Sequence, residues 1–191
     1  MKLAEFDRLT QQALGDTLGP SEGFTFRNGT YYRELNSGVR QVVVIDFDTR
    51  SGKTFRVILG FNAKLVAGDL PAEDAGVYGV RYLGHNALAT KPTTFLCMDK
   101  LSASKSLTEV KQALSTVALP WFASVQTIEQ MADVVEDQYP AIKGQLLLHA
   151  GQREQAKAWL VKHVAYLRAQ HYAESDPAWI ETQRLLRASE A

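Results

Sequence analysis

Hydrophobic and polar residues recur with two different periods along the chain, and the period changes twice. In residues 3–18 apolar positions recur every three or four residues, which predicts an amphipathic helix ended by Gly19 and Pro20. Between residues 24 and 62 the period is two, as in strands that bury one face. Beyond residue 106 the helical period returns. The order of helix, strands and helices predicts an α+β protein.

Short turns divide the extended region into strands. Asn28-Gly29 is a strong signal for a two-residue hairpin, and the glycine at position 38 marks a second turn. We therefore expect an antiparallel meander with one face against the N-terminal helix. Its strands are predicted at residues 24–26, 30–35, 39–48 and 53–62, with another strand at 93–98.

Residues 63–91 are rich in glycine and show little periodicity. This composition predicts a long loop, interrupted by one strand at residues 77–83. Loops of this length inside compact domains are often functional. The segment is therefore a candidate cover for a binding pocket.

The rest of the chain carries signals for helix ends. Ser106 and Glu109 have the spacing of a capping box, as do Thr127 and Gln130, and Pro120 is expected to end the first of these helices. Further helices are predicted at residues 140–151, 152–172 and 176–188. We assign residues 1–138 to an α+β domain and residues 139–191 to a helical extension packed on the same domain.

The stretch IDFDTRSGKT at residues 45–54 ends like a phosphate-binding loop. Such a loop also needs a glycine five residues before Gly52, where Phe47 stands, and it must begin a helix. The residues after Thr54 instead alternate like a strand. The sequence therefore predicts a hairpin turn and no nucleotide site.

Charge and cysteine content narrow the partners and the compartment. Lys plus Arg and Asp plus Glu number 21 each, so no excess positive charge is available to neutralise nucleic acid. The single cysteine, Cys97, suits a reducing compartment. Residues 1–18 lack the apolar core of a signal peptide, and no apolar run is long enough to cross a membrane. We expect a cytoplasmic protein that binds neither nucleic acid nor membrane.

Two aspartates form a candidate metal site. Asp46 and Asp48 lie at i and i+2 on a predicted strand and share one face, where their oxygens could hold Mg²⁺ or Mn²⁺. They could equally pair with arginines on neighbouring strands. The four histidines show none of the spacings typical of zinc sites, and we predict no cofactor.

Aromatic and basic residues form a candidate binding surface on the second predicted strand. Tyr31 and Tyr32 point to opposite faces, so one of them lies away from the N-terminal helix. Together with Arg33 they are residue types that anchor protein interfaces. The alternative is that the C-terminal helices cover this second face.

A second candidate group lies in the segment 63–91. Arg81, Tyr82 and His85 are close together in the sequence. Arg81 could bind a carboxylate or phosphate through two hydrogen bonds, and His85 could act as an acid or base near neutral pH.

The run GFTFRNGTYYRELNSGVRQVVVIDFDTRSGKTFRVILGF resembles the core of the bacterial DUF4304 family, a group named for lacking an assigned function. The element Arg81-x-x-Gly84 is similar to an arginine-glycine element that follows the strands of that family. Leu119-Pro-Trp121 resembles a later Leu-Pro-aromatic entry to a helix. The resemblance covers residues 1–138 and implies the fold, but it implies no catalytic residues.

Two hypotheses for function follow. The leading one is a non-enzymatic protein-binding module, with an immunity or inhibitor protein that neutralises a toxin as one form of it. The rival is an enzyme or ligand-binding protein that gathers Asp46, Asp48, Arg81 and His85 around a pocket under the 63–91 segment. A homodimer held by the C-terminal helices is a third possibility.

Overall fold

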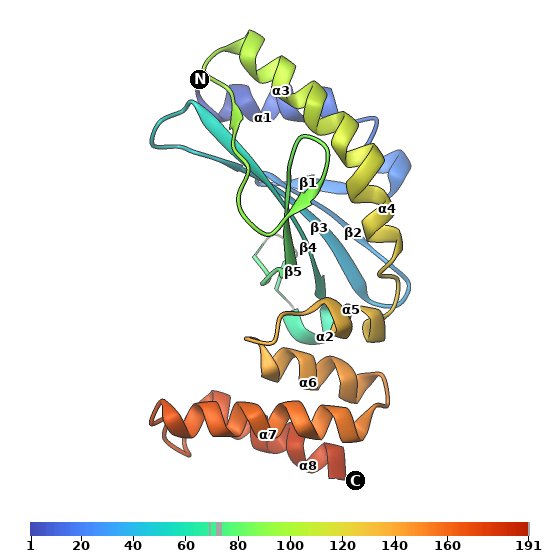
Figure 1. The fold of residues 1–191 in the computed structure, drawn as a ribbon, viewed down its shortest axis with the longest axis vertical. Coiled ribbons are helices and arrows are strands. Elements are labelled where there is room, and N and C mark those ends of the chain that lie inside the picture. Colours follow the sequence, from blue (N-terminus) through green and yellow to red (C-terminus); the bar gives the residue numbers. More distant parts are fainter. Residues whose placement is uncertain (69, 72–73, 191) are drawn as a thin grey trace. The chain divides into compact units, whose positions relative to one another are not determined.

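The computed structural model describes residues 1–68, 70–71 and 74–190, shown as a ribbon in Figure 1. The chain divides into two compact units, residues 1–126 and 127–191. The first unit holds the sheet with its helices, and the second holds helices only, which confirms the predicted α+β class. Helix α5 (Ile128–Val134) falls in the second unit, so this division lies one helix before the boundary expected at residue 138.

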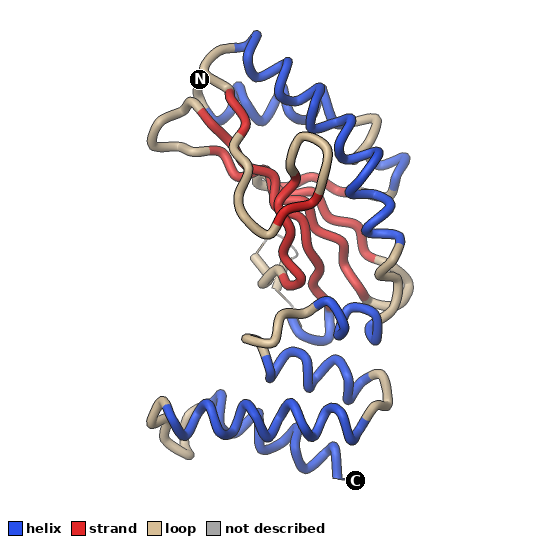
Figure 2. The backbone as a smooth tube through the Cα atoms, in the orientation of Figure 1, coloured by secondary structure: helices blue, strands red, loops and turns tan. Residues whose placement is uncertain are grey.

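The sheet is a meander in which each strand pairs antiparallel with the next from β1 to β6, as predicted for its first four strands. Strand β7 pairs with the N-terminal end of β4. Figure 2 shows the strands in red. Their bounds are β1 Thr25–Arg27, β2 Thr30–Glu34, β3 Val39–Phe47, β4 Thr54–Ala63, β5 Tyr78–Leu83, β6 Leu88–Ala89 and β7 Phe95–Leu96.

The long β3–β4 hairpin gives the sheet two different faces. Odd-numbered residues of both strands share the helix-covered face, which includes the directly opposed pairs Val43–Leu59 and Phe47–Phe55. All four of these side chains are buried. We call the face that carries the even-numbered residues of β3 and β4 the second face.

Three helices cover the first of these faces: α1 (Leu3–Leu14), α3 (Lys100–Ala113) and α4 (Leu119–Ala123). Figure 1 shows them along one side of the sheet. The ring of Phe6 lies 4.8 Å from that of Phe47, and the ring of Trp121 lies 4.8 Å from that of Phe61, measured between centroids. Burial of these aromatic rings supplies much of the driving force for folding the first unit.

Two predicted helix ends are wrong. Helix α3 begins at Lys100, six residues before Ser106, because Asp99 caps it: the Asp99 carboxylate accepts from the Ser102 amide at 2.8 Å and the Ser102 hydroxyl lies 3.0 Å from the Asp99 amide. Ser106 is buried inside that helix. Helix α1 ends at Leu14 rather than at residue 18, and the chain turns back with the Leu18 amide donating to the Leu14 carbonyl.

Pro120 does not end a helix, contrary to the prediction. A π-helical segment, η2 (Leu114–Ala118), connects α3 directly to α4, and Pro120 lies just beyond it. A wider π turn changes which carbonyl lies beside the proline ring, whose nitrogen cannot donate. The helix therefore continues far enough to bring Trp121 and Phe122 onto the sheet.

The segment 63–91 is more structured than a long loop. It contains α2 (Lys64–Ala67) and β6 in addition to β5, which matches the strand predicted at residues 77–83. Strand β5 comes very close to β4: a Cβ atom added to Gly60 would lie 2.8 Å from the carbonyl oxygen of Tyr78.

The second unit consists of α5, α6 (Pro140–His149), α7 (Arg153–Ala169) and α8 (Pro177–Glu190). The predicted capping box is present, since the Thr127 hydroxyl accepts from the Gln130 amide at 3.2 Å. Helix α7 matches the helix predicted at residues 152–172, and one apolar stripe of it is buried: Ala156, Leu160, Val164 and Leu167. Trp179 of α8 is buried in one cluster with Val164 and Leu167.

The hairpin between β1 and β2 gives a direct test of the fold. Asn28 and Gly29 both have positive φ, 49° and 76°, as a two-residue turn of this hand requires. Gly29→Ala is expected to lower the free energy of unfolding by about 1–2 kcal/mol, because a Cβ atom is strained in this conformation. Urea unfolding measures the change.

Asn28→Gly is the matched control, since glycine accepts positive φ without strain, and it is expected to change stability by less than about 0.5 kcal/mol. Equal losses in the two variants would contradict the turn geometry.

Candidate functional site

The alternation of β2 separates the three residues predicted to form one binding surface. Tyr31 opposes Val43 and Arg33 opposes Gln41, which places both on the helix-covered face. Tyr32 opposes Val42 and lies on the second face. Tyr31 is only 2% exposed, so its side chain is not part of an accessible surface, whereas Tyr32 is half-buried.

Arg33 connects several elements of the first unit. Its Nε and Nη2 atoms donate to Oε1 of the fully buried Gln41 at 3.0 and 2.6 Å, and its Nη1 donates to the Glu22 carbonyl at 3.0 Å. The Gln41 amide donates in turn to the Phe122 carbonyl at 2.9 Å. The guanidinium also lies 4.6 Å from the centroid of the Phe24 ring. Arg33 therefore stabilises the fold with its hydrogen-bonding groups already engaged.

The second face carries a contiguous group of half-buried side chains, the apolar row. Val44, Ile58 and Tyr82 oppose one another across β3, β4 and β5. Tyr32, on β2, lies diagonal to Val44 of β3, within reach of cross-strand contact. The row thus joins Tyr32 and Tyr82, two predicted site residues that are 50 positions apart in the sequence, on one face.

Charged pairs border the apolar row along the strands. Arg56 of β4 donates to the carboxylate of Asp46 on β3. At the opposite end of β3, beyond the apolar row, Nε of Arg40 donates to the carboxylate of Glu34 on β2 at 2.7 Å. An aromatic and aliphatic centre with a charged border is the usual anatomy of a protein interface.

The two aspartates of the candidate metal site have other partners. Asp46 pairs with Arg56, which is the alternative that the sequence left open. Asp48 accepts from the Arg50 and Ser51 amides and from the Ser51 hydroxyl, and these hydrogen bonds lower the pKa of its carboxyl. Strand β4 follows this turn directly, which confirms the hairpin predicted for the GKT stretch. Among the described residues, no group of three or more His, Cys, Asp and Glu is placed to hold a metal ion.

Arg81 and His85 also have local partners. Arg81 opposes Leu59 and donates to the Val80 carbonyl at 2.9 Å. Nδ1 of His85 lies 2.9 Å from a carboxylate oxygen of Glu109 on α3. The polar cavity that contains Asp46 and Asp48 has neither Arg81 nor His85 among the described residues that line it.

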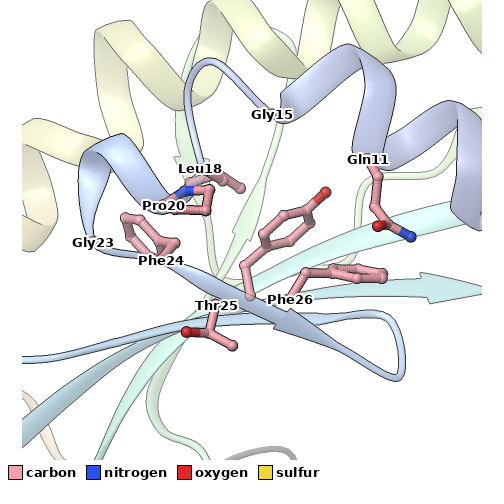
Figure 3. A pocket seen from close by; sticks show the side chains of 10 residues that line it. Gln11, Gly15, Leu18, Pro20, Gly23, Phe24, Thr25 and Phe26 are labelled. Atoms are coloured by element: carbon pink, nitrogen blue, oxygen red, sulfur yellow. The ribbon is translucent and has the colours of Figure 1, made fainter.

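A cavity of about 410 Å³ lies between the end of α1 and the β1–β2 hairpin, and we call it the Tyr31 cavity. Figure 3 shows its walls, with Phe24 and Phe26 on one side and Gln11 and Leu18 on the other. The Tyr31 hydroxyl is buried and has no hydrogen-bond partner among the described residues. An unpaired buried hydroxyl costs about 1–3 kcal/mol, which makes this one the most unusual polar atom of the site.

Sequence reasoning missed this cavity, although one signal points to it. Gly15, Gly19 and Gly23 recur every fourth residue beside its walls. A Cβ atom on Gly19 would lie 1.9 Å from the Gly15 carbonyl oxygen, and Gly23 has φ of +77°. The backbone can bend around the cavity only with glycine at these two positions.

The second unit has its own apolar groove, of about 670 Å³, lined by residues of α6 and α7 and the segment before α6. Tyr139 and Tyr166 line it and are 38% and 52% exposed. Such a groove is compatible with the homodimer predicted for the C-terminal helices, which stays a prediction.

Comparison with known protein families, with curated proteins and with solved structures finds no match to this chain. The resemblance to DUF4304 therefore stays a prediction. In the described part of the chain, none of the helices has the combination of length and apolar content that crossing a membrane requires.

The buried Cys97 gives a chemical test of the first unit. Burial raises the pKa of its thiol to about 11, and the side chain is fully inaccessible. At about pH 8 roughly one thiol in a thousand is then ionised, and the thiolate is the reactive form. We expect Ellman's reagent to react with the folded protein at least about 100-fold more slowly than with the chain unfolded in guanidinium chloride. Equal rates would contradict the placement of Cys97.

Proposed function

We propose that this chain is a non-enzymatic protein-binding module that contacts its partner with the second face of its sheet. The observation that supports this function best is the apolar row, in which Tyr32, Val44, Ile58 and Tyr82 are half-buried. Tyrosine is enriched among the residues that dominate binding energy at protein interfaces.

The shape of the sheet favours binding through its face. The strand at one edge, β1, has three residues, and β6 at the other has two. Short edge strands offer few backbone groups for an added strand from a partner. The apolar row, in contrast, extends across four strands.

An ion pair also supports a binding role over a metal-dependent one. Arg56 donates to the carboxylate of Asp46, whereas a metal ligand must direct its oxygens at the ion. A toxin is one partner class that this proposal allows.

A photo-crosslinking experiment tests the proposal. p-Benzoylphenylalanine placed at position 58 lies in the middle of the apolar row, and the same residue at the exposed position 104 on α3 is the control site. Irradiation in native lysate is expected to give one specific heavier species from position 58 only. Candidates are identified by mass spectrometry, beginning with proteins encoded next to this one.

Variants then locate the surface. Tyr32→Ala with Tyr82→Ala is expected to weaken the purified complex by about 30-fold, the effect of losing an interface hot spot. Tyr166→Ala, at an exposed tyrosine of the second unit, is the matched control and should leave affinity unchanged. The proposal is wrong if position 104 gives the same species, or if the double variant binds like the unaltered protein.

A further inference from the structure

The Tyr31 cavity has one hydrogen-bonding group that the protein itself leaves unused. Tyr31 is 98% buried, since its exposed fraction is 2%, and its hydroxyl has no partner among the described residues. Tyrosine hydroxyls in protein interiors usually find a partner. Gln41 on the neighbouring strand shows that this face can satisfy a buried polar side chain, because both ends of its amide are hydrogen-bonded.

The walls of the cavity are mainly apolar. Phe24 and Leu18 are buried, and Phe26 is half-buried with its ring 4.6 Å from that of Tyr31. Figure 3 shows Gln11 reaching from α1 toward Phe26. Apolar walls with a few convergent polar groups are typical of small-molecule sites, and a volume of about 410 Å³ is within their usual range.

The charges near the cavity favour a neutral ligand. The guanidinium of Arg33 lies 4.6 Å from the centroid of the Phe24 ring, and its donors are engaged by Gln41 and the Glu22 carbonyl. Burial, and then the negative charge of Asp7, raise the pKa of the Tyr31 hydroxyl, which therefore stays protonated and acts as a donor. The same negative charge disfavours an anion beside it.

We propose that the Tyr31 cavity binds a small, neutral ring compound whose hydrogen-bond acceptor, a carbonyl oxygen or ring nitrogen, takes the Tyr31 hydroxyl as donor. The rings of Phe24 and Phe26 provide the stacking surface. The site is independent of the apolar row, because Tyr31 and Tyr32 lie on opposite faces of β2.

Two walls of the cavity are fixed before a ligand binds. Arg33 packs over the ring of Phe24 and is held by hydrogen bonds to Gln41, which fixes one wall. Gly19 and Gly23 fix the backbone of another wall of the cavity. A preformed site loses little conformational entropy on binding.

Two probes of the same shape test the proposed hydrogen bond. Acetophenone carries a carbonyl oxygen, and α-methylstyrene has a CH₂ group in its place. Binding is measured as ligand-induced shifts of the Phe24, Phe26 and Tyr31 ring signals by NMR, using protein with labelled aromatic side chains. Tyr31→Phe is expected to weaken acetophenone about 3- to 10-fold, the value of one neutral hydrogen bond, and to change α-methylstyrene less than twofold.

Tyr32→Phe is the matched control, because it removes a hydroxyl from the adjacent residue on the other face, and it should leave both affinities unchanged. Benzoate, an anion of similar shape, should bind most weakly. Without ligand, Tyr31→Phe should melt at the same temperature as the unaltered protein or higher, because its hydroxyl has no partner to lose.

Three results would overturn the proposal. The first is the absence of any shift in the Phe24 and Phe26 signals at millimolar probe. The second is an equal effect of Tyr31→Phe on acetophenone and α-methylstyrene. The third is tighter binding of benzoate than of acetophenone.

Discussion

The register between β3 and β4 is the constraint on which the rest of the first unit depends. It runs from Val39 opposite Ala63 to Phe47 opposite Phe55. Because side chains alternate with a period of two, a slip of one residue would move every core-facing side chain of the slipped strand to the other face. The aromatic contacts of Phe6 with Phe47 and Phe55 hold the register from the helix side.

This register also decides what each side of the sheet can do. On the helix-covered face it places Gln41 where Arg33 and the Phe122 carbonyl satisfy its amide. The same face holds the Tyr31 hydroxyl, which has no such partner among the described residues. On the second face it aligns Val44 with Ile58, the centre of the apolar row. One face therefore encloses a cavity, and the other presents a surface at the apolar row, although Val42 and Asn62 on that face are buried.

The strands were the most predictable part of the fold. Alternation in β3 and β4 and the Asn28-Gly29 turn are local signals, and they gave the meander correctly. The helix start at Ser106 was mispredicted because a capping box at Asp99 begins the helix earlier, and the end at Pro120 because a π-helical segment precedes the proline. Ser106 is buried on the inner side of α3, and the segment after Pro120 continues as a helix to bring Trp121 onto Phe61.

The sites were less predictable than the strands. The alternation of side chains along β2 places Tyr31 and Tyr32 on opposite faces. Which of the two faces the helices cover depends on the side of the sheet on which they pack, and this is not a local property of the sequence. The pairing of Tyr82 with Ile58 depends on how the chain returns to the sheet within the segment 63–91, where no local signal sets the register. The Tyr31 cavity arises from the backbone path around Gly19 and Gly23, which becomes visible only in three dimensions.

Residue-resolved nitration with tetranitromethane tests the division of the sheet into two faces most directly. Tyr31 and Tyr32 are adjacent in the sequence, so tandem mass spectrometry of one peptide compares them under identical conditions. We expect rapid nitration of Tyr32 and protection of Tyr31 until the protein is unfolded, because Tyr31 is buried and burial raises the pKa of its hydroxyl. Nitration of Tyr31 as fast as that of Tyr32 in the folded protein would contradict it.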